Sequence, residues 1–192
     1  KGILKWGYKH EYITDISYRD KIEVFKAATH KEKIQDKFLE AQEAAELVAG
    51  MQQPIWRSVT QFLLLSGLRI GELAALKKSD VSFKERMIHV AKTYDTVNHV
   101  VTDVKTIESR RDVYMQDDLL AVAKEINLLM MKQKMMHGYQ TDLFISDKDG
   151  GYIKYYAYNK YLKYNARRIL ERSITPHTLR HPYAKHTIQT HT

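Results

Sequence analysis

The sequence predicts a mainly α-helical domain of the α+β class that carries a small three-stranded antiparallel sheet. From Leu39 onward, apolar residues recur with the 3.6-residue period of amphipathic helices. Between residues 87 and 115 this period gives way to short runs rich in β-branched and aromatic residues. A chain of 192 residues, 44% of them hydrophobic, is long enough for one buried core plus a fragment of something else.

Two segments precede the predicted core. Residues 1–18 are interpreted as the last helix of a preceding domain, because Trp6 and its apolar neighbours have little to pack against within so short a piece. Residues 19–38 are charge-rich and weakly patterned, which suits a linker. The main domain is therefore expected at residues 39–192, and the parent protein is expected to continue upstream.

Three helices are predicted in the first part of the main domain. The first has an apolar face between Ala44 and Met51 and ends before Pro54. Proline suits the first turn of a helix, so a second helix is expected to start there and to end at Gly67. Residues 68–76 predict a short third helix.

The predicted sheet follows these helices. Its three strands are expected at residues 87–90, 100–105 and 111–115, with turn-like residues at 94–96 and 106–109 between them. This order would place Lys105 at the tip of the second hairpin.

The second half of the chain is again predicted to be helical. A long helix is expected from 116 to 137 with Gly138 past its end, followed by a turn at 147–151, a helix at 155–170 and a last helix opened by Pro176. Four methionines of the long helix are expected to be flexible core filler rather than a binding surface: Met130, Met131, Met135 and Met136.

The net charge of +8 is concentrated near the C-terminus. From Tyr152 onward, eight lysines and arginines face a single acid, and seven of the thirteen tyrosines lie among them. Such interleaving is typical of a surface that meets a phosphate backbone. A solvated basic helix would explain the charge run taken alone, but the arginine motifs described below favour nucleic acid.

Composition also excludes several classes of protein. The chain has no cysteine, which excludes a disulfide framework and is compatible with a reducing cytoplasm. No apolar run approaches membrane-spanning length, and the first residues lack the layout of a signal peptide. We therefore expect a cytoplasmic protein without a membrane partner.

Three polar motifs carry the chemistry. They are SGLRIGEL at residues 66–73, KTIESR at 105–110 and TPHTLRH at 175–181. Arginine offers a rigid donor fork that matches phosphate, lysine offers a proton from a flexible stem, and histidine exchanges a proton near neutral pH. Together these side chains predict a site that grips one phosphodiester without a metal.

In this order, the motifs resemble the catalytic domain of tyrosine recombinases, and more narrowly the integrases of temperate phages and conjugative transposons. The family patterns are G-L-R-x-x-E-L, K-T-x-x-S-x-R and T-P-H-x-L-R-H, and the resemblance extends from about Leu39 onward. A single short motif would be weak, whereas three in order are specific. The resemblance implies that residues 1–18 end a core-DNA-binding domain.

The resemblance also implies a reaction, in which a tyrosine hydroxyl attacks the scissile phosphate and forms a 3′-phosphotyrosyl link. Arg69 and Arg180 would hold the non-bridging oxygens, and Lys105 would protonate the leaving 5′ oxygen. His177 would bond the phosphate or assist with the nucleophile's proton. Spacing alone favours an ordinary exposed helix pair for Arg69 and Glu72, one helical turn apart. The family motif carries an acid at this place, and the resemblance therefore implies that Glu72 orients the guanidinium of Arg69.

Partners follow from the same resemblance. Four basic residues are expected to bind DNA outside the catalytic group: Arg110, Lys160, Lys163 and Arg167. The expected partners are double-stranded attachment sites of a mobile element, three further copies of the protein in a tetramer, and an accessory DNA-bending or excision factor. No cofactor is expected. His177 and His181 have the spacing of a helical zinc pair, but Thr178 replaces the usual glutamate and Arg180 would sit beside the metal, so no metal is expected.

The chain departs from the family pattern near its C-terminus. The family nucleophile lies several helical turns beyond the second arginine, and Tyr183 is too close to Arg180 for that part, so we expect the chain to be truncated before its catalytic tyrosine. Pro182 should kink or end the last helix. Residues 185–192 match the family poorly and are given no role.

Alternatives remain open from the sequence. A chromosome-dimer resolvase or a type IB topoisomerase would use the same chemistry. A non-catalytic DNA-binding module would keep the phosphate-gripping surface without the nucleophile.

Overall fold

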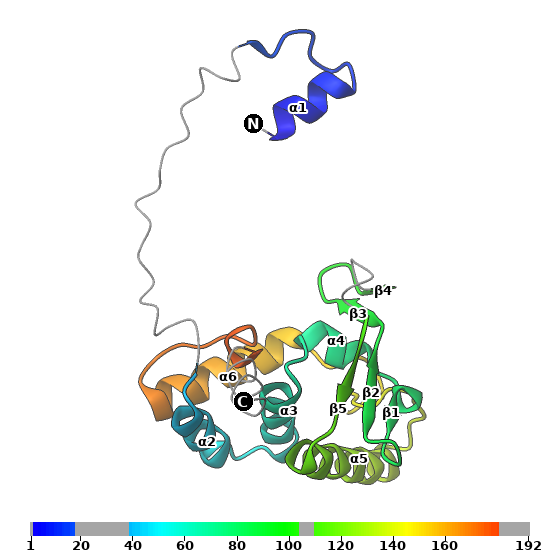
Figure 1. Ribbon diagram of the computed structural model, residues 1–192, viewed down its shortest axis with the longest axis vertical. Helices are drawn as coiled ribbons and strands as arrows, with labels where there is room; N and C mark the ends of the chain where they lie inside the picture. Colours follow the sequence, from blue (N-terminus) through cyan, green and yellow to red (C-terminus); the bar gives the residue numbers. More distant parts are fainter. Residues whose placement is uncertain (1, 18–38, 104–109, 181–192) are drawn as a thin grey trace, which may run out of the picture. The chain divides into compact units, whose positions relative to one another are not determined.

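The structure is a computed structural model, and it describes residues 2–17, 39–103 and 110–180 (Figure 1). The described residues fall into two compact units, one with residues 2–17 and one with the remainder. The domain division expected from the sequence stays a prediction.

The first unit contains helix α1 (Gly2–Lys9). The indole ring of Trp6 stacks on the ring of Tyr12, with ring centroids 5.5 Å apart, and also contacts the ring of His10. Gly7 is buried beneath Ile13. The helix predicted in this segment is therefore present, and its rings form a cluster that is largely exposed.

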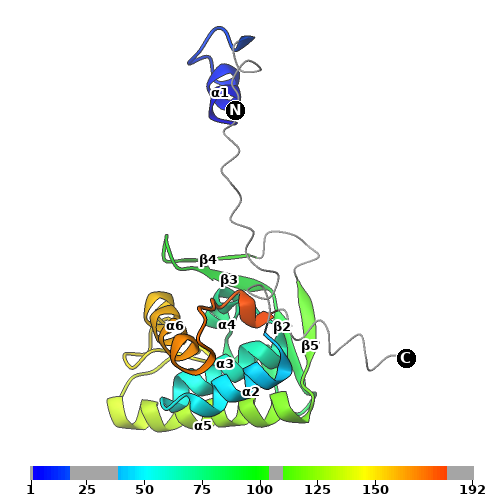
Figure 2. The ribbon, with the colours of Figure 1, turned by 90° about the vertical axis from the view of Figure 1, so that its left-hand side faces the viewer.

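The second unit is built around α3 (Pro54–Ser66), its central helix. Its helical elements are α2 (Ala41–Gly50), α3 (Pro54–Ser66), α4 (Ile70–Ala75), the 3-10 turn η3 (Lys78–Asp80), α5 (Asp117–His137), α6 (Tyr155–Leu170) and the 3-10 turn η5 (Thr178–Arg180). Helix α3 contacts α2, α5 and η5, and α2 packs on α6. Figure 2 shows α5 running along the base of this unit beneath α2 and α3. The ring of Phe62 on α3 packs on Phe144, and buried Tyr158 of α6 shares a hydrogen bond with Thr60.

The predicted helix ends agree with the backbone conformations. Pro54 occupies the first turn of α3, where its missing N–H costs no helical hydrogen bond. Gly67 and Gly138 end α3 and α5 in the left-handed region, with φ of 64° and 71°. These glycines are therefore needed as stop signals, and the helices at 116–137 and 155–170 are confirmed to within one residue.

Within the described residues, five short strands form two antiparallel sheets. The three-stranded sheet has the order β1 (Val81–Ser82), β2 (Met87–Val90) and β5 (Arg111–Tyr114), and the second sheet pairs β3 (Lys92–Asp95) with β4 (Val100–Asp103). Ile88 lies opposite Val81 on one side and Val113 on the other. All three side chains are buried and attach the first sheet to the helical core.

The strand pairing predicted from the sequence is wrong in one respect. The segment beginning at residue 100 is not the middle of the three-stranded sheet, since it pairs with β3 in the second sheet. The carboxylate of Asp95 accepts hydrogen bonds from the amides of Val97 and Asn98, which closes a turn that returns β4 onto β3. Strand β4 is exposed along its whole length, so it has no core face that would direct it between β2 and β5.

The expectation for the methionines is also wrong for three of the four. Met130 is buried in the core, but Met131, Met135 and Met136 are 55%, 85% and 79% exposed. The face of α5 that meets α3 is occupied by residues such as Ile126 and Met130, and the other three methionines project from the remaining faces.

The C-terminal part of the prediction is only partly described. The turn at 147–151 is present, with the Asp147 carboxylate accepting from the amides of Asp149 and Gly151. Past Pro176 the described residues form only the 3-10 turn η5. His181, Pro182 and Tyr183 lie outside the described residues. Across the part of the chain that is described, no helix is long and apolar enough to cross a membrane.

Candidate active site

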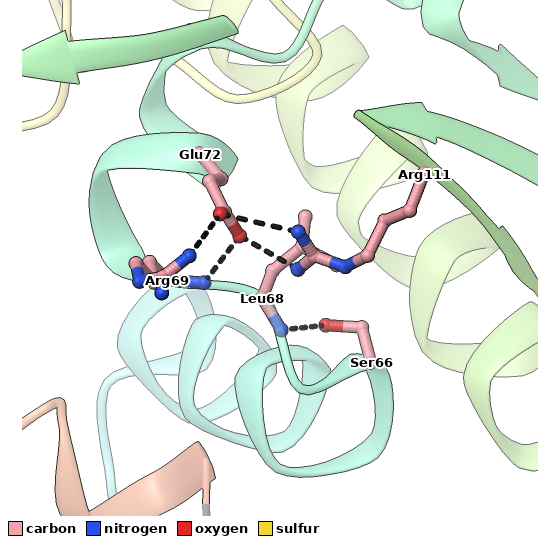
Figure 3. A network of polar contacts seen from close by, with 5 residues as sticks. All are labelled: Ser66, Leu68, Arg69, Glu72 and Arg111. Carbon is pink, nitrogen blue, oxygen red and sulfur yellow. Dashed lines mark hydrogen bonds and ion pairs between the residues drawn. The ribbon is translucent and has the colours of Figure 1, made fainter. Parts of the chain in front are cut away.

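The candidate site lies where α3 ends, α4 begins and β5 passes close by. Gly67 turns the chain out of α3, Leu68 is buried, and Arg69 is the N-cap of α4. The amide of Leu68 donates to the Ser66 hydroxyl at 3.3 Å, which tightens this corner (Figure 3). The SGLR part of the motif thus places one arginine at a defined position on a helix start.

The carboxylate of Glu72 lies at the centre of the site. Its side chain is only 1% exposed. Its oxygens accept from the backbone amide of Arg69 at 2.8 Å and from Arg69 Nη1 at 2.9 Å (Figure 3). This is the i,i+3 contact that the spacing suggested, and it holds both the backbone and the guanidinium of Arg69.

A second guanidinium approaches the same carboxylate from β5. Arg111 donates from Nη2 to Oε2 of Glu72 at 2.8 Å and from Nη1 to Oε1 at 3.2 Å (Figure 3). Such a two-point contact fixes orientation as well as distance. We call Arg69, Glu72 and Arg111 the carboxylate cluster.

The hydrogen bonds keep Glu72 ionised in spite of its burial. Burial by itself raises the pKa of this carboxyl, but the hydrogen bonds from Arg111 and from the Arg69 amide, with the charge of Arg111, lower the pKa below its ordinary value. The buried charge is therefore compensated rather than isolated.

Arg180 brings a third guanidinium to this region from η5. The turn is anchored by buried Thr178 and Leu179, and the amide of Arg180 donates to the carbonyl of His177. Burial lowers the pKa of Arg180, and the positive charge of Arg69 lowers it further. Arg180 thus lies within electrostatic reach of the carboxylate cluster, and the three arginines outnumber their single buried acid.

Helix α4 is held close to the second sheet. A Cβ added at Gly71 would lie 2.7 Å from the Thr93 hydroxyl and 2.9 Å from the Tyr94 carbonyl oxygen. Because only glycine permits this approach, Arg69 is fixed relative to the hairpin of β3 and β4. The G in R-x-G-E is therefore a packing requirement of the site.

The residues predicted to be catalytic are placed as follows. Arg69 and Glu72 are in contact, Arg180 is near enough for their charges to shift its pKa, and His177 is exposed immediately before η5. Lys105 lies outside the described residues, between the end of β4 and the start of β5. The roles assigned to these residues stay predictions.

The residues predicted to bind DNA lie in two places. Arg110 is exposed and pairs with Asp103 at 3.3 Å. Lys160, Lys163 and Arg167 lie on α6, where they line an open groove of about 610 Å³ together with tyrosines such as Tyr164. The α6 group is separate from the carboxylate cluster in sequence and comes from a different helix.

Sequence reasoning missed Arg111. The pattern K-T-x-x-S-x-R, counted from Lys105, places its arginine at 111, whereas Arg110 was selected. The two neighbours point differently, since the Arg110 side chain is 59% exposed and the Arg111 side chain is 27% exposed. Counting the spacing to its end would have found the residue that contacts Glu72.

Among residues 2–17, 39–103 and 110–180, no three histidine or acidic side chains gather as they would around a metal ion.

Replacing Glu72 tests the carboxylate cluster. We expect Glu72→Gln to lower the free energy of unfolding at pH 7 by about 2–3 kcal/mol, because it leaves Arg111 without its buried counter-charge. Because the pKa of Glu72 is lower in the folded than in the unfolded chain, its contribution is complete above the ordinary value of 4.5 and is lost as the pH falls through the folded pKa. The free energy of unfolding of the variant should therefore fall less steeply than that of the wild type as the pH is lowered.

Urea unfolding at several pH values measures both effects. Glu85→Gln is the matched control, because Glu85 is exposed, and it should leave stability unchanged. An unchanged stability for Glu72→Gln would mean that the cluster does not support the fold.

Comparison with known proteins relates this geometry to a family. Residues 37–191 match the model described as the phage integrase family. Transposase A from transposon Tn554 of Staphylococcus aureus is 24% identical over 160 residues, which cover 82% of this chain and 42% of that protein. The prophage ps2 probable integrase of Lactococcus lactis is 33% identical over 132 residues, covering 60% and 35%. The chain thus spans less than half the length of these relatives.

Solved structures share the fold. The Tn1549 transposon integrase in complex with transposon right end DNA aligns with a TM-score of 0.66 at 18% identity, over 93% of this chain and 59% of that one. XerA recombinase aligns with a TM-score of 0.60 at 19% identity, over 98% and 59%. The fold, the motif order and the match over most of its length agree, and this chain belongs to the phage integrase family of tyrosine recombinases.

Proposed function

We propose that the protein containing this chain carries out site-specific DNA recombination, integrating and excising a mobile element. It would cleave and rejoin strands through a 3′-phosphotyrosyl intermediate. The observation that carries this proposal is the contact of Arg69 with a buried carboxylate, with Arg180 near enough for the charge of Arg69 to lower its pKa. Relatives named as transposases and a prophage integrase support the same reading.

The two arginines would stabilise charge on the scissile phosphate. About half of the Arg69 side chain is exposed, so it can meet an anion while Glu72 holds Nη1. Arg180 is partly buried, and the repulsion it experiences from Arg69 is relieved when a phosphate lies between them. Guanidiniums fixed before the substrate arrives need no reorganisation as charge develops in the transition state.

Proton transfer would fall to Lys105 and His177. Lys105 follows β4 by two residues and precedes β5 by six, and the first residue of β5, Arg111, contacts Glu72. A lysine there would protonate the leaving 5′ oxygen. His177, exposed beside Arg180, would bond the phosphate or take the nucleophile's proton. We propose that the tyrosine nucleophile lies after the T-P-H-x-L-R-H motif, where the resemblance places it.

DNA would also be held along α6. Lys160, Lys163 and Arg167 present their charges on one side of this helix, with Tyr156 and Tyr164 exposed among them. The Tn1549 integrase is described in complex with DNA, which supports duplex DNA as the partner. We further propose attachment sites as the targets, a tetramer as the active assembly, an accessory DNA-bending or excision factor, and action on DNA inside a bacterial cell.

Salt dependence tests the DNA surface. The chain should bind a duplex with a steep loss of affinity as salt rises, about −0.9 in log affinity per log salt for each phosphate contacted. Replacing Lys160, Lys163 and Arg167 by glutamine should flatten this slope by roughly two to three units in fluorescence anisotropy titrations. A matched triple replacement on α5, at Lys124, Lys132 and Lys134, should change it far less. Equal losses from both triples would remove the assignment of α6.

Sulfur substitution in the substrate separates stabilisation of the phosphate charge from proton transfer to the leaving group. In the full-length protein, with EDTA present, Arg180→Ala and Lys105→Ala should both abolish cleavage of an ordinary phosphodiester. A substrate whose bridging 5′ oxygen is sulfur has a leaving group that needs no proton. This substrate should restore cleavage by Lys105→Ala and leave Arg180→Ala defective. Rescue of neither variant, or of both equally, would contradict Lys105 as the acid.

A further inference from the structure

We propose that Arg111 is a positioning residue, which takes up the charge of Glu72 so that Glu72 can orient Arg69 without neutralising it. The inference rests on the proposed function, because it concerns how Arg69 meets a phosphate. It assigns a role to an arginine that is not among the residues proposed to touch the DNA.

Charge balance within the cluster motivates the proposal. A lone carboxylate that held Arg69 would cancel the positive charge that a phosphate must feel. Glu72 is instead bound by two guanidiniums, so its single negative charge is shared between Arg69 and Arg111. The two-point contact is made by Arg111, and Arg69 uses one guanidinium nitrogen.

The exposure of the two arginines divides their tasks. The Arg69 side chain is 51% exposed and the Arg111 side chain 27%, with Glu72 almost fully covered between them. Figure 3 shows the Glu72 carboxylate between the two guanidiniums, and Arg69 is the more exposed of the two arginines. A substrate phosphate would contact Arg69, while Arg111 compensates the negative charge of the Glu72 carboxylate.

Arg111 also joins two parts of the site along the chain. It is the first residue of β5, paired with Val90 of β2, and it lies six residues after Lys105. Its contact with Glu72 ties the start of this strand to α4. The Arg111 side chain therefore connects β5, the strand that follows Lys105 in the chain, to α4, the helix whose N-cap is Arg69.

The geometry requires arginine rather than any cation. A lysine at this position would supply the charge from a single nitrogen and would lose the two parallel bonds to Oε1 and Oε2. Arg111→Lys should therefore retain part of the effect, and Arg111→Met should lose all of it. Arg57→Met is the matched control, because the guanidinium of Arg57 pairs with Glu125 at 3.4 Å and not with Glu72.

The test compares two substrates in the full-length protein. One has an ordinary scissile phosphodiester, and the other has a methylphosphonate there, in which a neutral methyl group replaces one charged oxygen. For the ordinary substrate, Arg111→Met should lower the single-turnover cleavage rate by about 100-fold. The loss on the methylphosphonate should be much smaller, because less charge needs compensation. Arg69→Ala should show the same pattern, and Arg57→Met should match the wild type on both substrates.

The ratio of the two rates separates positioning from a fold defect. Leu73→Ala creates a cavity in the core next to Glu72 and should lower both rates in parallel, so its ratio stays at the wild-type value. Arg111→Lys, which keeps the charge and is the variant expected to fold, should shift the ratio in the same direction as Arg111→Met by a smaller factor.

Two results would overturn the role of Arg111. One is a wild-type rate for both Arg111 variants, and the other is an equal loss on both substrates. With either of these results, cleavage of DNA by the wild-type protein would still support the proposed function. Absence of cleavage by the wild type would reject the proposed function, and the role of Arg111 with it.

Discussion

The organisation of the site depends on one buried carboxylate that binds two arginines. Glu72 receives donors from the N-cap of α4 and from the first residue of β5, two positions 42 residues apart in the chain. Without its charge, the two guanidiniums would repel each other at the junction of helix and sheet. The cluster is thus both a tertiary contact and the support of the residue proposed to grip phosphate.

Backbone constraints around the cluster serve the same arrangement. Gly67 turns the chain out of α3 in a conformation that other residues rarely adopt, and Gly71 allows α4 to lie directly against β3. The buried positions of α3 then hold this corner against the core. Since each of these contacts is packed, Arg69 has little freedom to leave the position that Glu72 gives it.

Much of the helical architecture could be predicted from the sequence, because the stop and start signals are local. Pro54, Gly67 and Gly138 act through their own backbone chemistry, and the structure uses all three as expected. The sheet was harder, because pairing depends on partners distant in sequence. The exposed strand β4 has no alternation from which its partner could be read, and two-residue β1 has no pattern at all. The exposed methionines of α5 were missed because composition does not tell which face of a helix meets the core.

The candidate site, like the fold, could be predicted from the sequence only in part. Motif spacing identified Arg69, Glu72 and Arg180, but contact between Glu72 and Arg111 arises only when α4 and β5 are brought together. The most direct test of the account is NMR of the arginine Nε–Hε groups in this chain as a short duplex is added at low salt. The signals of Arg69 and Arg180 should shift while that of Arg111 stays in place, and Glu72→Gln should weaken the shift of Arg69. A shift of Arg111 with Arg69 unchanged would contradict the account.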